Sequence, residues 1–319
     1  MKFHIFGSLS LKEGLVTVEE EKPQDTLDDK VRKVKFPKIH IPVGGRLTHF
    51  LQEWEQITQD QWVLSIIKDG YKLEFLQKPP FQGIKKTVVS TKNLDILNLE
   101  INSLLEKGAI EKVPVKERMT GFYSTLFLVP KKNGQMRPVI NLKPLNQYLR
   151  KQHFKMDTIS KVLNLVKQGD WAISLDLKDA YFHIKVFKNH RKYLRFSVQG
   201  QVYQFKALCF GPTSSPRVFT KVVVSVVAAH LRKQNIRLAV YLDDWMCVNQ
   251  FQQKLVIDRE IMLNLLVRLG FFNQSRKVQF NTKSNNHLFG SGVQVRSRFG
   301  ITLLQLRTGY RVYFYQYKK

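Results

Sequence analysis

The sequence predicts an α+β fold in which helices alternate with short hairpins around an antiparallel sheet. Several stretches place apolar side chains at helical spacing, and others are short apolar runs bounded by turn residues, which is the pattern of paired strands. The clearest helical stripe, ended by Gly108, consists of Leu94, Leu97, Ile101, Leu104 and Leu105. A chain of 319 residues is long enough for one large or two modest domains with a hydrophobic core.

The predicted hairpins follow one another along the chain. Asn133-Gly134 is a strong hairpin turn signal between two apolar runs. The three predicted strand pairs are 124–129 with 137–142, 193–198 with 201–205, and 238–242 with 245–248. Residues 172–177 form a further apolar strand. Asp157 is expected to cap the helix that follows it, and Ser215-Pro216 to begin a long helix.

Composition divides the chain into four parts. Residues 1–43 are largely polar and charge-mixed, as expected of a flexible leader. Residues 44–83 have the spacing of a helical N-terminal extension, with a break at Thr58 to Asp60. Residues 84–270 hold the alternating helices and hairpins, and residues 271–319 form a basic tail in which no acidic residue occurs.

The charge balance predicts a polyanionic partner. The chain has 52 Lys+Arg against 25 Asp+Glu, a net charge of +27 and a pI near 10.0. Nucleic acid is the leading candidate, because basic groups that neutralise phosphates release condensed counterions. A ribosomal-type basic protein and a membrane-surface binder are the alternatives. The 22 Phe, 11 Tyr and 4 Trp argue against a simple basic tail protein.

Cysteine usage and hydropathy favour a soluble intracellular protein. Cys209 and Cys247 have no partner at zinc-site spacing, so two unpaired thiols are expected, with one disulfide as the alternative. No apolar run reaches membrane-spanning length, and the N-terminus lacks the apolar core of a signal peptide. The sequence does not separate nucleus from cytoplasm.

Three carboxylates stand in unusual positions. Asp176 lies inside an apolar strand and is expected to be buried there, while Asp243 and Asp244 occupy a tight turn between apolar strands. If the strands are neighbours, the three converge at one sheet edge, where they suit a pair of magnesium ions roughly 4 Å apart. A solvated turn explains Asp243-Asp244 taken alone, and Asp28-Asp29 is a comparable pair in the leader.

At these residues the chain resembles a known family. Tyr241-Leu242-Asp243-Asp244 resembles the Y-x-D-D box of reverse transcriptases, and residues 174–182 (SLDLKDAYF) resemble their other metal-binding segment. Residues 128–141 resemble the fingers hairpin, and residues 208–219 the family's L-P-F-G segment, with Cys209 in place of proline. The ordered motifs cover roughly residues 94–290 and are more specific together than singly.

The resemblance implies a right-hand polymerase with fingers, palm and an incomplete thumb. It would extend a DNA primer along an RNA template with dNTPs, using two Mg²⁺ ions or alternatively Mn²⁺. The implied catalytic and metal residues are Asp176, Asp243 and Asp244, with Leu177 assisting through its carbonyl. The implied nucleotide-binding residues are Lys131, Lys132, Arg137, Tyr181 and Phe210.

Each of these roles has a simpler alternative. Tyr181 is expected to exclude a 2′-hydroxyl but otherwise packs in the core, and the two lysines otherwise sit at an exposed hairpin tip. His183 and His190 are expected to be surface or packing residues. Lys277 is a candidate general acid for pyrophosphate. Leu288-Phe289-Gly290 resembles the primer grip with two letters exchanged, so residues 271–319 are expected to hold the primer-grip region and the truncated start of a thumb.

Residues 45–71 resemble the segment that precedes the polymerase in DIRS-like retrotransposons, with retroviral, Gypsy-like and hepadnaviral relatives as alternatives. Such elements imply RNase H, recombinase and capsid-like proteins as partners. The basic tail is interpreted either as a face for the template–primer duplex or as the end of a truncated copy. The alternative functions are therefore a catalytically inactive nucleic-acid-binding relic and, with less support, an RNA-directed RNA polymerase.

Overall fold

The computed structural model describes residues 41–130 and 136–271, apart from 155, 158 and 168, together with two short paired strands. These strands are β9 (Val295–Arg296) and β10 (Thr302–Leu303). The predicted leader lies outside the described residues up to residue 40. Most of the predicted primer-grip region after residue 271 also lies outside them.

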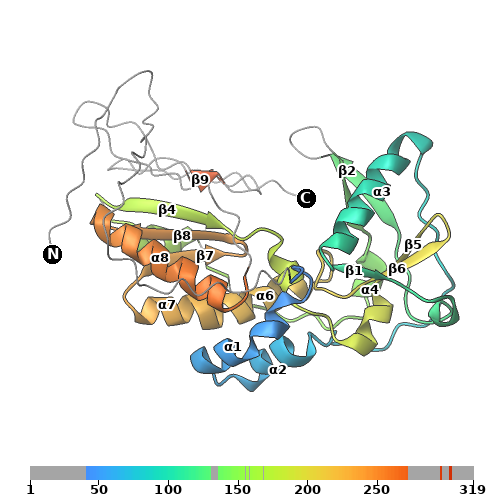
Figure 1. Ribbon diagram of the computed structural model, residues 1–319, viewed down its shortest axis with the longest axis horizontal. Helices are drawn as coiled ribbons and strands as arrows, with labels where there is room; N and C mark the ends of the chain where they lie inside the picture. The colour runs from blue at the N-terminus through green and yellow to red at the C-terminus, as the bar shows by residue number, and fades with distance from the viewer. Residues whose placement is uncertain are drawn as a thin grey trace, which may run out of the picture. The chain divides into compact units, whose positions relative to one another are not determined.

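A three-stranded antiparallel sheet carries the candidate site. Its order is β4-β8-β7, formed by β4 (Trp171–Asp176), β8 (Asp244–Asn249) and β7 (Arg237–Tyr241). The predicted hairpin of β7 and β8 is confirmed, although Asp244 begins β8 instead of belonging to the turn. Helix α8 (Gln252–Arg268) lies across the sheet (Figure 1) and packs against β4 and β8.

The two faces of this sheet are covered unequally. One face contributes Leu175, Trp245 and Val240 to the main hydrophobic core. The other face supports a small separate cluster that includes Met246 and is packed against side chains from α5 (Ile159–Leu165). Because side chains alternate between faces along a strand, the carboxylates of Asp176 and Asp244 belong to this second, less covered face.

A second antiparallel sheet and a separate hairpin form the other half of the described fold. The sheet has the order β1-β6-β5, with β1 (Ile110–Lys112), β6 (Gln201–Phe205) and β5 (Arg195–Val198). The hairpin pairs β2 (Leu126–Pro130) with β3 (Met136–Ile140), as predicted. Helix α3 (Thr91–Glu106) packs against β1 and β3. The 3₁₀ turns η2 (Val115–Glu117) and η4 (Lys188–Tyr193) lie in the connections.

The predicted helical extension forms, and its break falls where it was expected. It consists of η1 (Arg46–Phe50), α1 (Leu51–Ile57) and α2 (Gln61–Asp69). Asp60 caps α2, because one of its carboxylate oxygens accepts hydrogen bonds from the backbone N–H groups of Trp62 and Val63 at 2.9 and 3.2 Å. The indole of Trp54 is fully buried and donates to the carbonyl of Leu269 at 3.0 Å.

The long helix predicted after Ser215 is continuous but irregular. It runs through α6 (Ser215–Val222), a π-helical stretch η5 (Val223–Ala228) and α7 (Ala229–Lys233). The valines of its middle part are poor helix formers, but Val222, Val223 and Val227 are fully buried in the main core. Burial of apolar surface therefore outweighs the unfavourable propensity.

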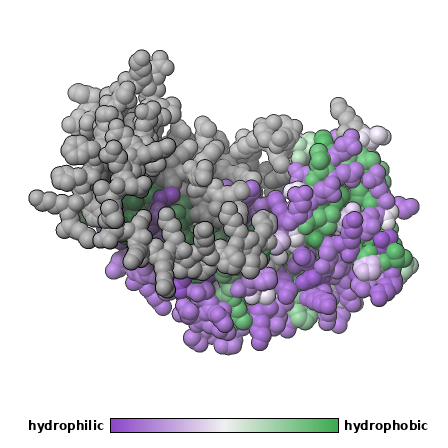
Figure 2. All heavy atoms as spheres, in the orientation of Figure 1, coloured by the Kyte–Doolittle hydropathy of each residue, from purple (hydrophilic) through white to green (hydrophobic). Residues whose placement is uncertain are grey.

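The visible surface of the described residues is mostly hydrophilic, with apolar side chains gathered near α3 and β2 (Figure 2). Leu99 on α3 and Phe127 on β2 are among the exposed large apolar residues. None of the described helices combines the length and apolarity needed to cross a membrane.

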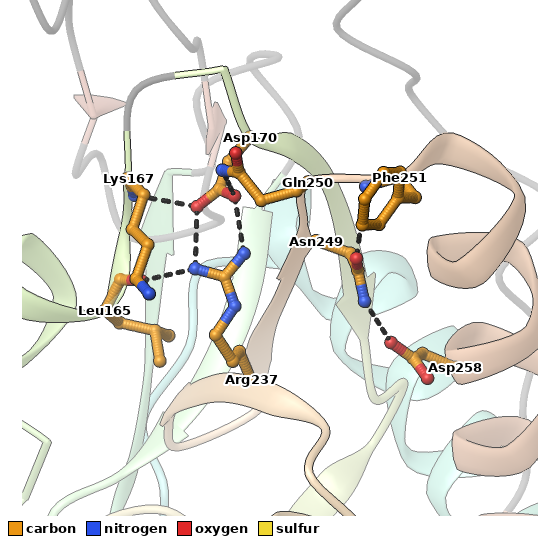
Figure 3. A network of polar contacts seen from close by, with 8 residues as sticks. All are labelled: Leu165, Lys167, Asp170, Arg237, Asn249, Gln250, Phe251 and Asp258. Carbon is orange, nitrogen blue, oxygen red and sulfur yellow. Dashed lines mark hydrogen bonds and ion pairs between the residues drawn. The ribbon is translucent and has the colours of Figure 1, made fainter.

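The end of the central sheet remote from the aspartates is closed by an ion-pair network (Figure 3). The guanidinium of Arg237 on β7 donates to both carboxylate oxygens of Asp170, which also accepts from the backbone N–H of Lys167 at 2.7 Å and from the side chain of Gln250. Burial raises the pKa of Asp170, but these hydrogen bonds outweigh burial and hold the pKa below its usual value.

We expect Asp170→Asn to lower the free energy of unfolding at pH 7 by about 2–3 kcal/mol, because it leaves Arg237 without its bidentate partner. The carboxylate stabilises the fold above the pKa of an unfolded aspartate, and this contribution is lost as the pH falls through the lowered folded pKa. Denaturant unfolding of wild type and variant should therefore differ at pH 7, and the difference should shrink as the pH falls below the pKa of an unfolded aspartate. Asp95→Asn, at an exposed position on α3, is the matched control.

Candidate active site

The strand register brings the three predicted carboxylates to one end of the central sheet. Asp176 lies directly opposite Asp244 on the neighbouring strand, and the backbone N–H of Leu177 donates to the carbonyl of Asp243 at 3.0 Å. Side chains of directly opposed residues share a face, with Cβ atoms about 5 Å apart. Residues separated by more than 60 positions in the sequence therefore meet at one sheet edge.

The burial of these carboxylates differs from the expectation. The expectation that Asp176 is buried inside its strand is wrong: β4 ends at this residue, and its side chain is exposed. Asp243, in the turn, is the buried one, with 8% of its surface exposed. Asp244 is intermediate in burial. Flanking apolar residues indicate that a strand is present, but they do not show at which residue the strand leaves the core.

The turn between β7 and β8 is strained. Tyr241 pairs with Asp244, so Leu242 and Asp243 are the two central residues of the turn. Such turns need positive φ, and Leu242 has φ 56°, a conformation that costs a leucine about 1 kcal/mol. Asp179, which follows β4, is also left-handed, with φ 55°. Strain of this kind persists where the surrounding structure over-determines it, and it concentrates at functional sites.

The carboxylates share an edge without forming a ready-made coordination sphere. Within the described part of the chain, no group of three or more His, Cys, Asp or Glu side chains is clustered closely enough to hold a metal ion. Asp176, Asp243 and Asp244 are thus neighbours by backbone register, but their side chains do not converge on one point. Their oxygen donors are nevertheless of the kind that magnesium prefers.

Tyr181 and Phe210 form an aromatic pair beside the carboxylates. Tyr181 belongs to the 3₁₀ turn η3 (Ala180–His183) and is 4% exposed. Its ring centroid lies 4.4 Å from that of Phe210 and 5.2 Å from that of Phe219. Burial raises the pKa of Tyr181 far above its usual value, and the charge of Asp243 raises it further, so its hydroxyl stays protonated. The ring is packed as in a core, yet it stands close enough to Asp243 to sense its charge.

The remaining predicted site residues are only partly described. The backbone of Arg137 lies in β3, opposite Val129, but the position of its side chain is outside the description. Leu177 is buried directly after β4. The predicted residues that lie outside the described part of the chain are Lys131, Lys132, Lys277, Leu288, Phe289 and Gly290.

The two histidines and the two cysteines are packing residues. His190 packs edge-on against Phe75 and Phe187, and His183 is fully buried. Cys209 and Cys247 are free and buried, and burial raises the pKa of each thiol to about 12. The expectation of two unpaired, inert thiols is confirmed.

Sequence reasoning missed the role of Asp157. Its buried carboxylate accepts hydrogen bonds from the backbone N–H of Val240 at 3.0 Å, from Arg232 at 2.5 Å and from Lys161 at 2.6 Å. Burial raises the pKa of Asp157, but these partners outweigh burial and lower it. The carboxylate thus fixes β7 one residue before Tyr241. In the sequence, an acid ahead of a helix indicates a helix cap. A hydrogen-bond partner 83 positions away cannot be predicted from the local pattern.

His183 gives this region a pH-dependent stability. Burial lowers its pKa to about 4, and its ring lies 5.2 Å from that of Phe271. The unfolded chain takes up a proton on this histidine below about pH 6.5, while the folded chain resists until about pH 4, so stability falls as the pH drops between these values.

We expect wild type to lose roughly 2 kcal/mol more stability than His183→Phe between pH 7 and pH 5, because phenylalanine keeps the ring but does not titrate. Denaturant unfolding at the two pH values measures the difference. His153→Phe replaces an exposed histidine and should leave the pH dependence of wild type intact. Equal pH slopes for wild type and His183→Phe would contradict a neutral buried imidazole.

Comparison with known proteins agrees with this geometry. The profile of the family described as reverse transcriptase (RNA-dependent DNA polymerase) matches residues 129–294, slightly more than half of the chain. The chain is 23% identical over 211 residues to the Transposon Tf2-3 polyprotein of Schizosaccharomyces pombe, covering 66% of this chain and 15% of the relative. It is 24% identical over 257 residues to the enzymatic polyprotein of Soybean chlorotic mottle virus, a match that covers 78% of this chain and 36% of the relative. The chain thus spans a minor part of these relatives.

Among solved structures, the fold is similar to that of the prototype foamy virus protease-reverse transcriptase. The TM-score is 0.54 at 18% identity, and the match covers 74% of this chain and 31% of that one. This likeness supports a mixed fold of antiparallel sheets and helices. The family profile matches more than half of the chain, including the strands beside the three aspartates. The chain therefore belongs to the reverse transcriptase family.

Proposed function

We propose that this chain is the RNA-directed DNA polymerase of a retroelement, which extends a primer with dNTPs along an RNA template by two-metal nucleotidyl transfer. The observation that carries the proposal is the register of β4 against β8, which sets Asp176 opposite Asp244 and beside Asp243. In this assignment, residues 84–270 form fingers and palm, the β4-β8-β7 sheet belongs to the palm, and the β2–β3 hairpin belongs to the fingers.

The three aspartates are proposed to hold the metal ions, with the Leu177 carbonyl as a further oxygen ligand. Three neighbouring carboxylates repel one another, and this repulsion is relieved when cations are bound between them. The donors are hard oxygens on rigid strand backbone, which suits Mg²⁺ and also Mn²⁺. When bound, the two ions would activate the primer hydroxyl and stabilise the leaving pyrophosphate.

Tyr181 is proposed to select deoxyribose by occupying the space of a 2′-hydroxyl. Its ring is buried, packs against those of Phe210 and Phe219, and lies near the carboxylate of Asp243. A ring fixed in this way cannot move aside for an extra hydroxyl, so it discriminates by steric exclusion. Phe210, on its exposed side, is proposed to contact the incoming nucleotide.

The triphosphate is proposed to bind Arg137 together with Lys131 or Lys132 of the β2–β3 hairpin. Arginine suits this role through its planar donor fork. Lys277 as general acid and residues 288–290 as primer grip rest on the sequence pattern alone. The proposed subclass is DIRS-like and also rests on a sequence pattern, that of residues 45–71. The partners of such elements, an RNase H, a recombinase and capsid-like proteins, are proposed with it.

A catalytically inactive, nucleic-acid-binding relic is the second candidate. The net charge of +27 favours binding to nucleic acid whether or not the chain is catalytic. Retention of all three aspartates favours the polymerase over the relic.

We expect Mg²⁺-dependent extension of a DNA primer on an RNA template, and at least a ~10³-fold loss of extension in Asp243→Asn through removal of a metal ligand. Mg²⁺ or Mn²⁺ should also raise the melting temperature of wild type, and raise it less in Asp243→Asn. Asp95→Asn, on the surface of α3, should behave as wild type. Salt-sensitive RNA binding without incorporation at any metal concentration would select the relic.

We expect Tyr181→Val to raise the incorporation of rNTPs relative to dNTPs about tenfold or more, because it empties the space of the 2′-hydroxyl. Single-nucleotide incorporation kinetics with matched dNTP and rNTP measure the ratio. Phe182→Ala removes the neighbouring ring of the same turn and should leave the ratio unchanged. If both variants lose activity with an unchanged ratio, Tyr181 is a packing residue.

A further inference from the structure

The loop between β6 and α6 carries Phe210, and a side chain from a distant helix holds it. Asn146 is the last residue of α4 (Lys143–Asn146). Its side-chain NH₂ donates to the carbonyl of Gly211 at 2.9 Å, and its side-chain oxygen accepts from the N–H of Thr213 at 3.0 Å. One carboxamide thus satisfies an acceptor and a donor of the same loop, as a strand partner would.

The two contacts lie on either side of Pro212, which has no N–H to contribute. Gly211 and Thr213 are exposed, so water could satisfy their backbone groups in other loop conformations. The two hydrogen bonds from Asn146 favour one of these loop conformations. Gly211 completes the arrangement: it has φ 121°, and a Cβ at this position would lie 3.0 Å from Leu142, four residues before Asn146.

The two ends of the loop are fixed independently. At its start, the N–H of Leu208 donates to the carbonyl of Ile184 at 2.8 Å. At its end, the buried hydroxyl of Ser215 donates to the carbonyl of Cys209 at 2.9 Å. Asn146 therefore acts on the middle of the loop, directly after Phe210.

The contact from Asn146 holds the backbone directly after Phe210. One side packs on Tyr181 at 4.4 Å, but 49% of the residue is exposed. Packing from one side leaves a phenylalanine free to change rotamer when its backbone moves. The hydrogen bond to the carbonyl of the next residue, Gly211, restricts that backbone movement.

We propose that Asn146 is a positioning residue for nucleotide selection, which holds Phe210 against Tyr181 and so keeps the sugar-discriminating ring rigid. The effect on nucleotide selection rests on the proposed function. The holding of the loop by Asn146 rests on its two hydrogen bonds to the loop backbone. Asn146 touches neither the aromatic pair nor the aspartates in the contacts described; it acts through the loop backbone.

The test compares Asn146→Ala with Asn264→Ala, which replaces an exposed asparagine on α8. In Asn146→Ala, the Thr213 amide should exchange with solvent about fivefold or more faster, because it loses its acceptor. The preference for dNTPs over rNTPs should fall about three- to fivefold, mainly through a higher KM for dNTPs. The control should change neither quantity.

Asn146→Asp keeps the acceptor for Thr213 but sets a carboxylate oxygen against the Gly211 carbonyl, so its selectivity should fall between wild type and Asn146→Ala. In a Phe210→Ala background, Asn146→Ala should lower selectivity no further, since the effect passes through that ring. A variant that merely loosens the fold would slow both nucleotides equally and leave the ratio unchanged.

The outcomes separate this inference from the proposed function. Unchanged exchange at Thr213 overturns the positioning role, whatever the activity. Faster exchange with an unchanged ratio, in an enzyme that incorporates dNTPs, overturns the selectivity role and leaves the polymerase standing. A wild-type chain without incorporation overturns both the polymerase and the selectivity role, while the exchange measurement still reports whether Asn146 holds the loop.

Discussion

The antiparallel register of β4 against β8 is the constraint on which the candidate site depends. Slippage by one residue would move Asp176 to the opposite face of the sheet and away from Asp244. The register is enforced from the other face, where Leu175 and Trp245 are directly opposed and buried in the main core. Apolar packing on one side of the sheet therefore determines which carboxylates meet on the other, and any change that disturbs that packing acts on the site without touching it.

The end of the sheet that carries the aspartates contains an unfavourable backbone conformation. It holds Leu242 in a left-handed turn, a conformation that opposes folding. Two buried carboxylates stabilise the same sheet. Near the site, Asp157 accepts hydrogen bonds from Val240 of β7 and from Arg232, and at the far end Asp170 forms an ion pair with Arg237. The balance is typical of active sites, in which geometry suited to a ligand is maintained by interactions that have no part in binding it.

Much of the fold was predictable because its signals are local. Asn-Gly and the Asp-Asp turn marked hairpins, apolar spacing marked the helices, and the break before Asp60 was placed correctly. The placement of the three aspartates at one sheet edge followed from treating two apolar strands as neighbours. The burial of Asp176 was predicted wrongly, because flanking apolar residues do not reveal where a strand ends. Asp157 and Asn146 act on residues 65 to 83 positions away, and such pairings leave no trace in a local pattern.

The buried indole of Trp54 has a consequence for how the chain is made. Its hydrogen-bond partner, Leu269, lies 215 positions later, and Arg46 likewise donates to the carbonyl of Gly270. At a synthesis rate of about 5–20 residues per second, Trp54 emerges from the ribosome some 10–40 s before Leu269, its hydrogen-bond partner. During that interval the indole lacks the hydrogen-bond acceptor that it has in the folded chain. Closure of these contacts must wait until Leu269 and Gly270 have been synthesised, so it is a late event in the folding of this part of the chain.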